Sequence, residues 1–76
     1  MNAKDRKLVS EWSDKLDKIK SEIEAMKEEQ EERFDNMPEG LQESERGEAM
    51  QEAIDNLECA VESIEEAIDS LNFAME

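Results

Sequence analysis

The sequence contains no histidine and no tyrosine, one cysteine, one proline and two glycines among 76 residues. Without an imidazole, and with Cys59 as the only thiol, the usual transition-metal sites and histidine-based catalytic triads are excluded. A lone cysteine forms no disulfide within the chain and is typical of a reducing environment. No apolar run exceeds three residues, so we expect neither a membrane span nor a signal peptide. These absences predict a cytoplasmic protein without a metal or other cofactor.

Basic residues are also scarce. The chain holds 9 Lys and Arg against 23 Asp and Glu, a formal net charge of −14. Residues 1–34 carry eight basic and ten acidic residues, whereas residues 47–76 carry nine acidic residues and no basic one. Nucleic acids and anionic membranes are bound through clustered positive charge. We therefore expect neither direct nucleic-acid binding nor membrane binding.

The most regular pattern lies in residues 47–75. Large apolar residues alternate there at spacings of four and three, which places them on one stripe of a helix. The seven-residue repeat is typical of a coiled coil. Met75 ends the stripe, and the residues before it are the predicted oligomer core: Met50, Ile54, Leu57, Val61, Ile64, Ile68 and Leu71.

A second apolar stripe, of the same spacing, lies in the first half of the chain. It consists of Val9, Trp12, Leu16, Ile19, Ile23 and Met26. Trp12 is accordingly interpreted as a core residue. Asn2 is a suitable N-terminal cap for this helix, whereas Asn36 and Pro38 disfavour its continuation.

Two helices of similar length joined by a short connection predict an all-α fold, an antiparallel helical hairpin. We expect a single domain, residues 1–76, with a helix over 3–35, a connection over 36–44 and a helix over 45–75. Ser44 is the predicted cap of the last helix, and Pro38 and Glu39 allow a short helical turn within the connection. The hairpin would turn about residue 39 or 40 and place Trp12 near Ile68.

The predicted apolar face is too wide for one neighbouring helix to cover. Beside the stripe of residues 47–75, a further column is alanine in every heptad: Ala53, Ala60, Ala67 and Ala74. Each large apolar side chain left in water forfeits roughly 1.5–3 kcal/mol, which is a large share of the stability of so small a domain. We therefore expect a homodimer or higher homo-oligomer, most simply a four-helix bundle of two hairpins.

The carboxylates lie outside both stripes. General acid–base catalysis requires a carboxylate in an apolar pocket, and a di-metal bundle requires Glu or His side chains that point inward. No calcium loop, phosphate-binding glycine loop or nucleophile elbow is present. Cys59 lies in an outward column without a basic neighbour to activate its thiol. We expect no enzymatic activity and interpret Cys59 as an incidental surface residue.

The apolar pattern is interrupted at the hairpin end, and such departures are frequent at functional sites. Gln30 and Arg33 interrupt the first stripe, and Gly47 interrupts the second. Because a helix N-terminus beside two arginines suits an anion, the predicted ligand-binding residues are Gln30, Arg33, Gln42, Ser44 and Arg46. The alternative is that Arg33 and Arg46 pair with neighbouring carboxylates and bind no ligand.

A connecting segment of the form Asn-x-Pro-Glu-x-Leu-Gln-x-Ser-Glu occupies residues 36–45 and leads into the heptads. In this respect the chain resembles small acidic two-helix proteins of bacterial phages and prophages, over roughly residues 35–71. The resemblance implies a phage protein that acts in the host cell cytoplasm, without catalytic activity. Small phage proteins of this kind commonly act by occupying a component of the host.

Three functions fit these features. The first is sequestration of an anionic, nucleotide-type signal of host defence at the hairpin end. The second is inhibition of a basic host protein by an acidic face that imitates nucleic acid, with Glu48, Asp55, Glu62, Glu65 and Asp69 as the protein-binding residues. The third is a structural or assembly role as a coiled coil. The net charge favours the second function, and the interrupted pattern favours the first, because contacts at short range outweigh a screened field.

Overall fold

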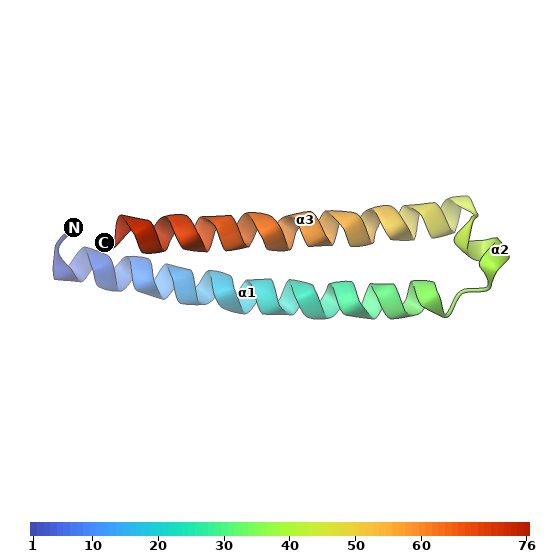
Figure 1. Ribbon diagram of the computed structural model, residues 1–76. Helices are drawn as coiled ribbons and strands as arrows, with labels where there is room; N and C mark the ends of the chain where they lie inside the picture. Colours follow the sequence, from blue (N-terminus) through green and yellow to red (C-terminus); the bar gives the residue numbers. More distant parts are fainter.

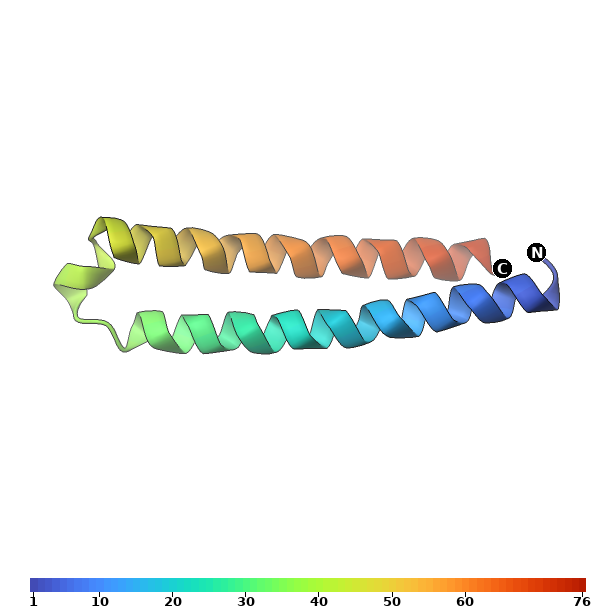
Figure 2. The same ribbon diagram turned by 180° about the vertical axis from the view of Figure 1, so that it is seen from behind.

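The chain folds into three helices. In the computed structural model, which describes residues 1–76, α1 spans Ala3–Asp35, α2 spans Glu39–Gln42 and α3 spans Glu45–Ala74. α1 and α3 run antiparallel, with both chain termini at one end and α2 at the other (Figure 1). Figure 2, seen from behind, shows the same two helices side by side along their length. The predicted all-α class and hairpin arrangement are confirmed, although α3 ends one residue earlier than predicted.

Side-chain caps fix the first residues of the two long helices. Asn2 Oδ1 accepts a hydrogen bond from the backbone amide of Asp5 at 2.8 Å, and Ser44 Oγ accepts one from the amide of Gly47 at 3.3 Å. Each cap satisfies an amide that has no partner within its own helix. Between the long helices, Pro38 adopts an extended backbone with φ −57° and ψ 146° and precedes the single turn of α2.

The hairpin is a rod of 58 × 14 × 12 Å with a thin core. Only five of its 76 residues are buried, and Val9, Ile54 and Val61 are the apolar side chains among them. No large side chain is fully buried. None of the three helices combines the length and the apolar character that a membrane span requires.

The side of α1 that faces α3 differs in part from the predicted stripe. Val9 is buried, and Leu16 and Ile23 are half-buried. The other three predicted residues are about half exposed: Trp12 at 50%, Ile19 at 45% and Met26 at 47%. A helix turns only two of its seven columns directly toward one neighbour, and the column of Trp12 lies just outside them. The interpretation of Trp12 as core is therefore wrong within a single hairpin.

Two ion pairs between α1 and α3 show the register of the hairpin. Lys27 pairs with Glu58, and Lys20 Nζ lies 3.9 Å from Glu65 Oε1. The residue numbers sum to 85 in both pairs, so the hairpin turns about residues 42–43. The predicted turn about residue 39 or 40 is wrong, and so is the proximity of Trp12 to Ile68. The extended backbone at Pro38 carries the chain past the end of α1 before α3 begins (Figure 1).

Candidate functional site

A cavity of about 290 Å³ lies at the hairpin end, where the three helices meet. Its lining residues are Arg33 of α1, Met37 of the connection, Leu41 of α2, and Arg46 and Met50 of α3. Two guanidinium groups and three apolar side chains thus share one hollow, and no carboxylate is among them. This combination suits a ligand with an anionic group attached to an apolar or aromatic part.

The two arginines of the cavity differ in their pairing. Arg33 Nη2 lies 2.6 Å from Glu29 Oε1, one turn earlier in α1, and both side chains are more than half exposed. An exposed pair at this spacing contributes roughly 0.3–0.5 kcal/mol, so a phosphate can displace Glu29. Arg46 takes part in none of the ion pairs of the structure. The alternative prediction is that neighbouring carboxylates pair with both arginines. It holds for Arg33 but not for Arg46.

Gln42 serves the connection and is not among the residues that line the cavity. Its side-chain amide donates hydrogen bonds to the backbone carbonyls of Phe34 at 2.9 Å and Met37 at 3.1 Å. The last carbonyls of a helix have no partner within it, so these bonds hold the end of α1 against the turn. Gln42 therefore acts as a structural residue of the hairpin end.

The remaining two predicted ligand-binding residues also lie outside the cavity lining. Ser44 caps α3 through its side-chain oxygen. Gln30 is half-buried, and its amide nitrogen lies 3.6 Å from the sulfur of Met26. Of the five residues predicted from the sequence, the structure brings only Arg33 and Arg46 together in one cavity.

The apolar part of the cavity is the part that sequence reasoning misses. The heptad pattern assigns Met50 only to the core and says nothing about Met37 and Leu41. An exposed connection has no local need for large apolar side chains, yet Leu41 is 50% exposed. Two such residues within a polar connection are the signal that points to this surface.

Gly47 allows α2 and α3 to approach closely at the hairpin end. A Cβ added to Gly47 would lie 2.2 Å from the carbonyl oxygen of Gln42 and 2.5 Å from that of Leu41. Gly47 is buried and falls in the same heptad column as Ile54 and Val61. The interruption of the second stripe at Gly47 is therefore a requirement of packing rather than a ligand contact.

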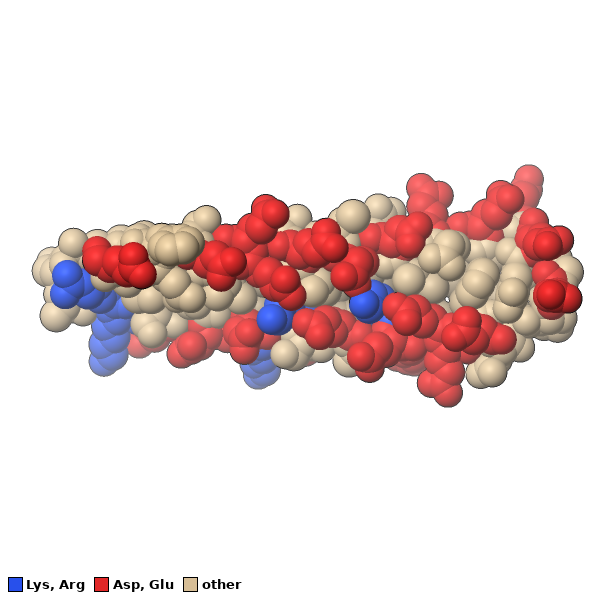
Figure 3. All heavy atoms as spheres, in the orientation of Figure 1, with Lys and Arg blue, Asp and Glu red and all other residues tan.

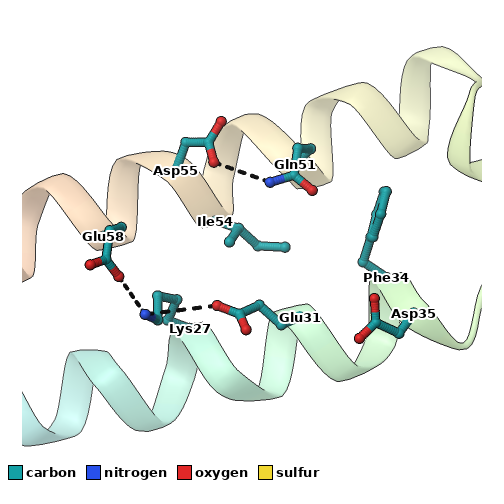
Figure 4. Close-up of a pocket in the computed structure, with 8 residues that line it drawn as sticks. All are labelled: Lys27, Glu31, Phe34, Asp35, Gln51, Ile54, Asp55 and Glu58. Carbon is teal, nitrogen blue, oxygen red and sulfur yellow. Dashed lines mark hydrogen bonds and ion pairs between the residues drawn. The ribbon is translucent and has the colours of Figure 1, made fainter.

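A second cavity, of about 370 Å³, lies between α1 and α3 and has the opposite character. Its lining includes four carboxylates: those of Glu31, Asp35, Asp55 and Glu58. Figure 4 shows Lys27 between Glu31 and Glu58, with which it forms ion pairs. The hydrogen bond from Lys27 to Glu58 raises the pKa of Lys27 above its ordinary value of 10.5. The cavity repels anions, and no three of its acidic side chains converge closely enough to hold a metal ion.

An acidic face runs along α3, and four of its residues recur every seven positions. Glu48, Asp55, Glu62 and Asp69 are all exposed and follow one another at about 10.5 Å along the helix. Glu65, in the neighbouring column, is 53% exposed and pairs with Lys20. Figure 3 shows acidic side chains along the whole rod. The five predicted protein-binding residues thus lie on one solvent-facing side of α3.

No family model matches the chain, and neither a curated protein nor a solved structure matches it. The function proposed below is therefore supported by the geometry of the hairpin end and by the distribution of charge.

Proposed function

We propose that this protein is a non-catalytic, homo-oligomeric binding protein that takes up a phosphate-bearing, nucleotide-type ligand at the Arg33–Arg46 cavity. The supporting observation is that, of the three cavities on the hairpin, this one alone is lined by two basic side chains and no acidic one. A guanidinium group binds a phosphate through two parallel hydrogen bonds. Met37, Leu41 and Met50 supply an apolar surface for a nucleobase.

The ligand is held and released unchanged in this proposal. The cavity lining contains no carboxylate, thiol or imidazole, so no group is suited to general acid–base or nucleophilic chemistry. In the phage context implied by residues 36–45, such binding would sequester a nucleotide signal of host defence in the host cytoplasm.

The net charge of −14 opposes the approach of an anion, so the contacts in the cavity must supply the affinity. At physiological ionic strength, charges separated by more than about 8 Å are largely screened. A charge-assisted hydrogen bond to phosphate acts at about 2.8 Å. Arg46, which has no carboxylate partner, is therefore expected to contribute more to the affinity than Arg33, which must first leave Glu29.

Isothermal titration calorimetry tests the proposal with inorganic phosphate, AMP, cyclic mono- and dinucleotides, and ADP-ribose. We expect at least one nucleotide to bind, and Arg33→Gln and Arg46→Gln each to weaken it by roughly tenfold or more, because a hydrogen bond to a charged group contributes about 1.5–3 kcal/mol. Lys18→Gln is the matched control, since it removes one positive charge from an exposed position near the middle of α1, far from the cavity. The proposal fails if no compound binds, or if all three substitutions have the same effect.

The acidic face of α3 supports a second candidate function, the blocking of a basic groove on a host protein. Glu48, Asp55, Glu62 and Asp69 form no ion pair, so their charge is available to a partner. A regular row of exposed negative charge steers association with a positively charged groove and specifies its direction. Nucleic acid competes for such a groove through the same electrostatic contacts.

This second function predicts a salt-sensitive complex with a basic host protein that duplex DNA displaces. The triple variant Asp55→Asn, Glu62→Gln, Asp69→Asn should lose the complex. The control triple variant Glu11→Gln, Asp14→Asn, Glu28→Gln removes the same charge from exposed positions of α1 and should retain it. Equal loss in the two variants would indicate a response to net charge alone and exclude a role for this face.

A further inference from the structure

The two long edges of the hairpin differ in character. One edge carries the ion pairs of Lys20 with Glu65 and of Lys27 with Glu58. On the other edge no ion pair joins the helices, and the residues are apolar. From α1 these are Trp12, Ile19 and Met26, and from α3 they are Leu57, Ile64 and Leu71. We call these six residues the apolar face.

The position of the hairpin-end cavity places both halves of the apolar face on the same edge. Arg33 lies seven residues after Met26, and Met50 lies seven residues before Leu57, so each shares a heptad column with one half. Arg33 and Met50 line the same cavity. The two columns are therefore neighbours along the rod. The side chains on α1 are about half exposed, and those on α3 are half-buried, so the face is open to a partner.

Two more columns of α3 beyond the apolar face carry no acidic residue. One column begins with Arg46 and continues with Ala53, Ala60, Ala67 and Ala74, and the next holds Ala49, Asn56, Ser63 and Ser70. The acidic residues of α3 all lie in the other columns. A second α3 brought against this side would therefore meet no negative charge, which is the condition for two helices of this composition to pack together.

The area of exposed surface fits one additional copy. A compact monomer of 8.8 kDa exposes roughly 4,800 Å² according to the scaling of surface with mass, whereas the hairpin exposes 5706 Å². The excess, on the order of 900 Å², is close to the roughly 800 Å² that each partner buries in a stable interface of standard size. One partner of equal size is enough to cover the face.

The distribution of charge specifies how that copy is oriented. The open end, residues 1–20 with 62–76, carries six basic and nine acidic residues, whereas the hairpin end, residues 27–58, carries three basic and twelve acidic ones. On the face drawn in Figure 3, basic side chains lie toward the end with the chain termini and in the middle of the rod, whereas acidic side chains dominate the hairpin end. Screening by salt limits the range of these electrostatic interactions to about 8 Å. On a rod of 58 Å, each end therefore interacts only with the end of the other copy that lies beside it. Antiparallel rods avoid the contact of two strongly acidic hairpin ends.

We propose that the apolar face binds a second copy of this chain with the rods antiparallel, α1 against α1 and α3 against α3. The inference rests on the homo-oligomer of the proposed function and adds its interface and orientation. The face is centred on Ile19 in α1 and on Ile64 in α3. By the register of the ion pairs, Ile64 lies level with Ser21, close to Ile19. A single two-fold axis perpendicular to the rods therefore passes near both centres.

The edge of this interface contains a complementary pair of charges. Lys15 and Glu22 share the heptad column next to that of Ile19 and border the apolar face. Pairing about Ile19 sets Trp12 of one copy against Met26 of the other and brings Lys15 beside Glu22 of the other copy. Parallel copies packed through the same face would be related by a two-fold axis along the rods, which sets α1 against α3 and leaves Lys15 and Glu22 apart. The antiparallel arrangement also places basic residues 4–7 of one copy near the arginine cavity of the other.

Sedimentation velocity of the whole chain tests the interface. We expect a dimer at micromolar concentration, a helical monomer for Ile19→Glu, and a dimer for the matched control Phe73→Glu, because Phe73 is 69% exposed and lies off the apolar face. A monomeric wild-type chain would overturn both this inference and the oligomer of the proposed function. A dimeric Ile19→Glu protein, or an equal effect of Phe73→Glu, would overturn only the assignment of the face. Ligand binding at Arg33 and Arg46 is measured separately.

Spin labels and pulsed electron resonance test the orientation. The native Cys59 is exposed and lies near the middle of the rod, so two labels there should be close together in the dimer. A label at Glu43→Cys, in a Cys59→Ala background, lies at the hairpin tip. In antiparallel rods the two tips are at opposite ends, and their separation approaches the rod length of 58 Å. Tip labels separated by no more than the width of two rods would overturn the antiparallel arrangement.

Charge reversal at the border provides a second test of orientation. Lys15→Glu should weaken the dimer by roughly threefold to thirtyfold, because exposed ion pairs are individually weak and a symmetric dimer contains this pair twice. Adding Glu22→Lys to Lys15→Glu should restore the dissociation constant of the natural chain, because the two opposite charges have then only exchanged positions. Glu22→Lys in the absence of Lys15→Glu should weaken the dimer similarly. Lack of restoration in the double variant would contradict the contact of Lys15 with Glu22.

Discussion

Lys27 of α1 donates a hydrogen bond to Glu58 of α3, which lies 31 residues further along the chain. The contact joins the long helices on their charged edge, and the Lys27 side chain is only 22% exposed. Glu31 and Glu24 add to the negative surroundings, although the hydrogen bond to Glu58 is the main cause of the raised pKa of Lys27. The folded protein thus holds the Lys27 proton more tightly than the unfolded chain does.

This contact should contribute stability up to alkaline pH and then lose it. Because the folded pKa of Lys27 lies above its ordinary value of 10.5, the contribution is complete below pH 10.5 and disappears as the pH rises through the folded pKa. A double-mutant cycle of Lys27→Gln and Glu58→Gln, followed by urea denaturation at fixed protein concentration, measures the coupling. Lys18→Gln, at an exposed position without an ion pair, is the control. A coupling that is unchanged at strongly alkaline pH would show that the contact is not ionic.

The two glycines should respond in opposite directions to alanine. Gly47→Ala forces a Cβ against the backbone of Gln42 and Leu41, and overpacking of this kind costs about 1–3 kcal/mol. Gly40 has no atom within 4 Å of an added Cβ, and alanine in a helix is favoured over glycine by up to about 1 kcal/mol. Thermal unfolding followed by circular dichroism should show a lower midpoint for Gly47→Ala and an equal or higher one for Gly40→Ala. A neutral Gly47→Ala variant would contradict the close packing of α2 on α3.

Truncation of Ile54 should be far more costly than truncation of Phe73. Ile54 is 6% exposed and fills the thin core, whereas Phe73 is 69% exposed. Ile54→Ala is expected to lower the free energy of unfolding by about 2–4 kcal/mol, and Phe73→Ala by less than about 0.5 kcal/mol. Urea denaturation at one protein concentration measures both. Similar losses in the two variants would place Phe73 in a contact that the single hairpin does not form.

Gln42 should stabilise the hairpin through its two donated hydrogen bonds. Gln42→Ala leaves the carbonyls of Phe34 and Met37 without these partners and is expected to cost about 1–2 kcal/mol. Gln42→Glu preserves the size of the side chain but removes the donors, so its loss should be at least as large. Gln51→Ala is the control, because its amide bonds only to the exposed Asp55. If Gln42→Glu is as stable as the natural chain, packing rather than hydrogen bonding accounts for Gln42.

Local features of the fold were predictable because they depend on residues a few positions apart. Asn2 and Ser44 satisfy amides three residues further along, so their capping roles can be deduced from adjacent sequence alone. The apolar spacing of α3 likewise follows from the helical repeat. Arg33 and Arg46 were identifiable at the hairpin end because they interrupt or adjoin this repeat. The role of Gln42 was not, because an amide side chain is equally compatible with a ligand or with a nearby carbonyl.

By itself, the sequence determined that the chain is helical, where its long helices begin, and that its apolar surface is wider than one helix covers. Only the tertiary structure decided which columns of α1 face α3, and therefore that Trp12, Ile19 and Met26 remain exposed. The tertiary structure also decided the register of the two long helices, which the extended backbone at Pro38 shifts. As a consequence, Met37 and Leu41 line the same cavity as the two arginines. The physical reason is one of range. Caps and helical periodicity arise from contacts within about one turn, whereas register depends on packing and ion pairs between residues that are remote in the sequence.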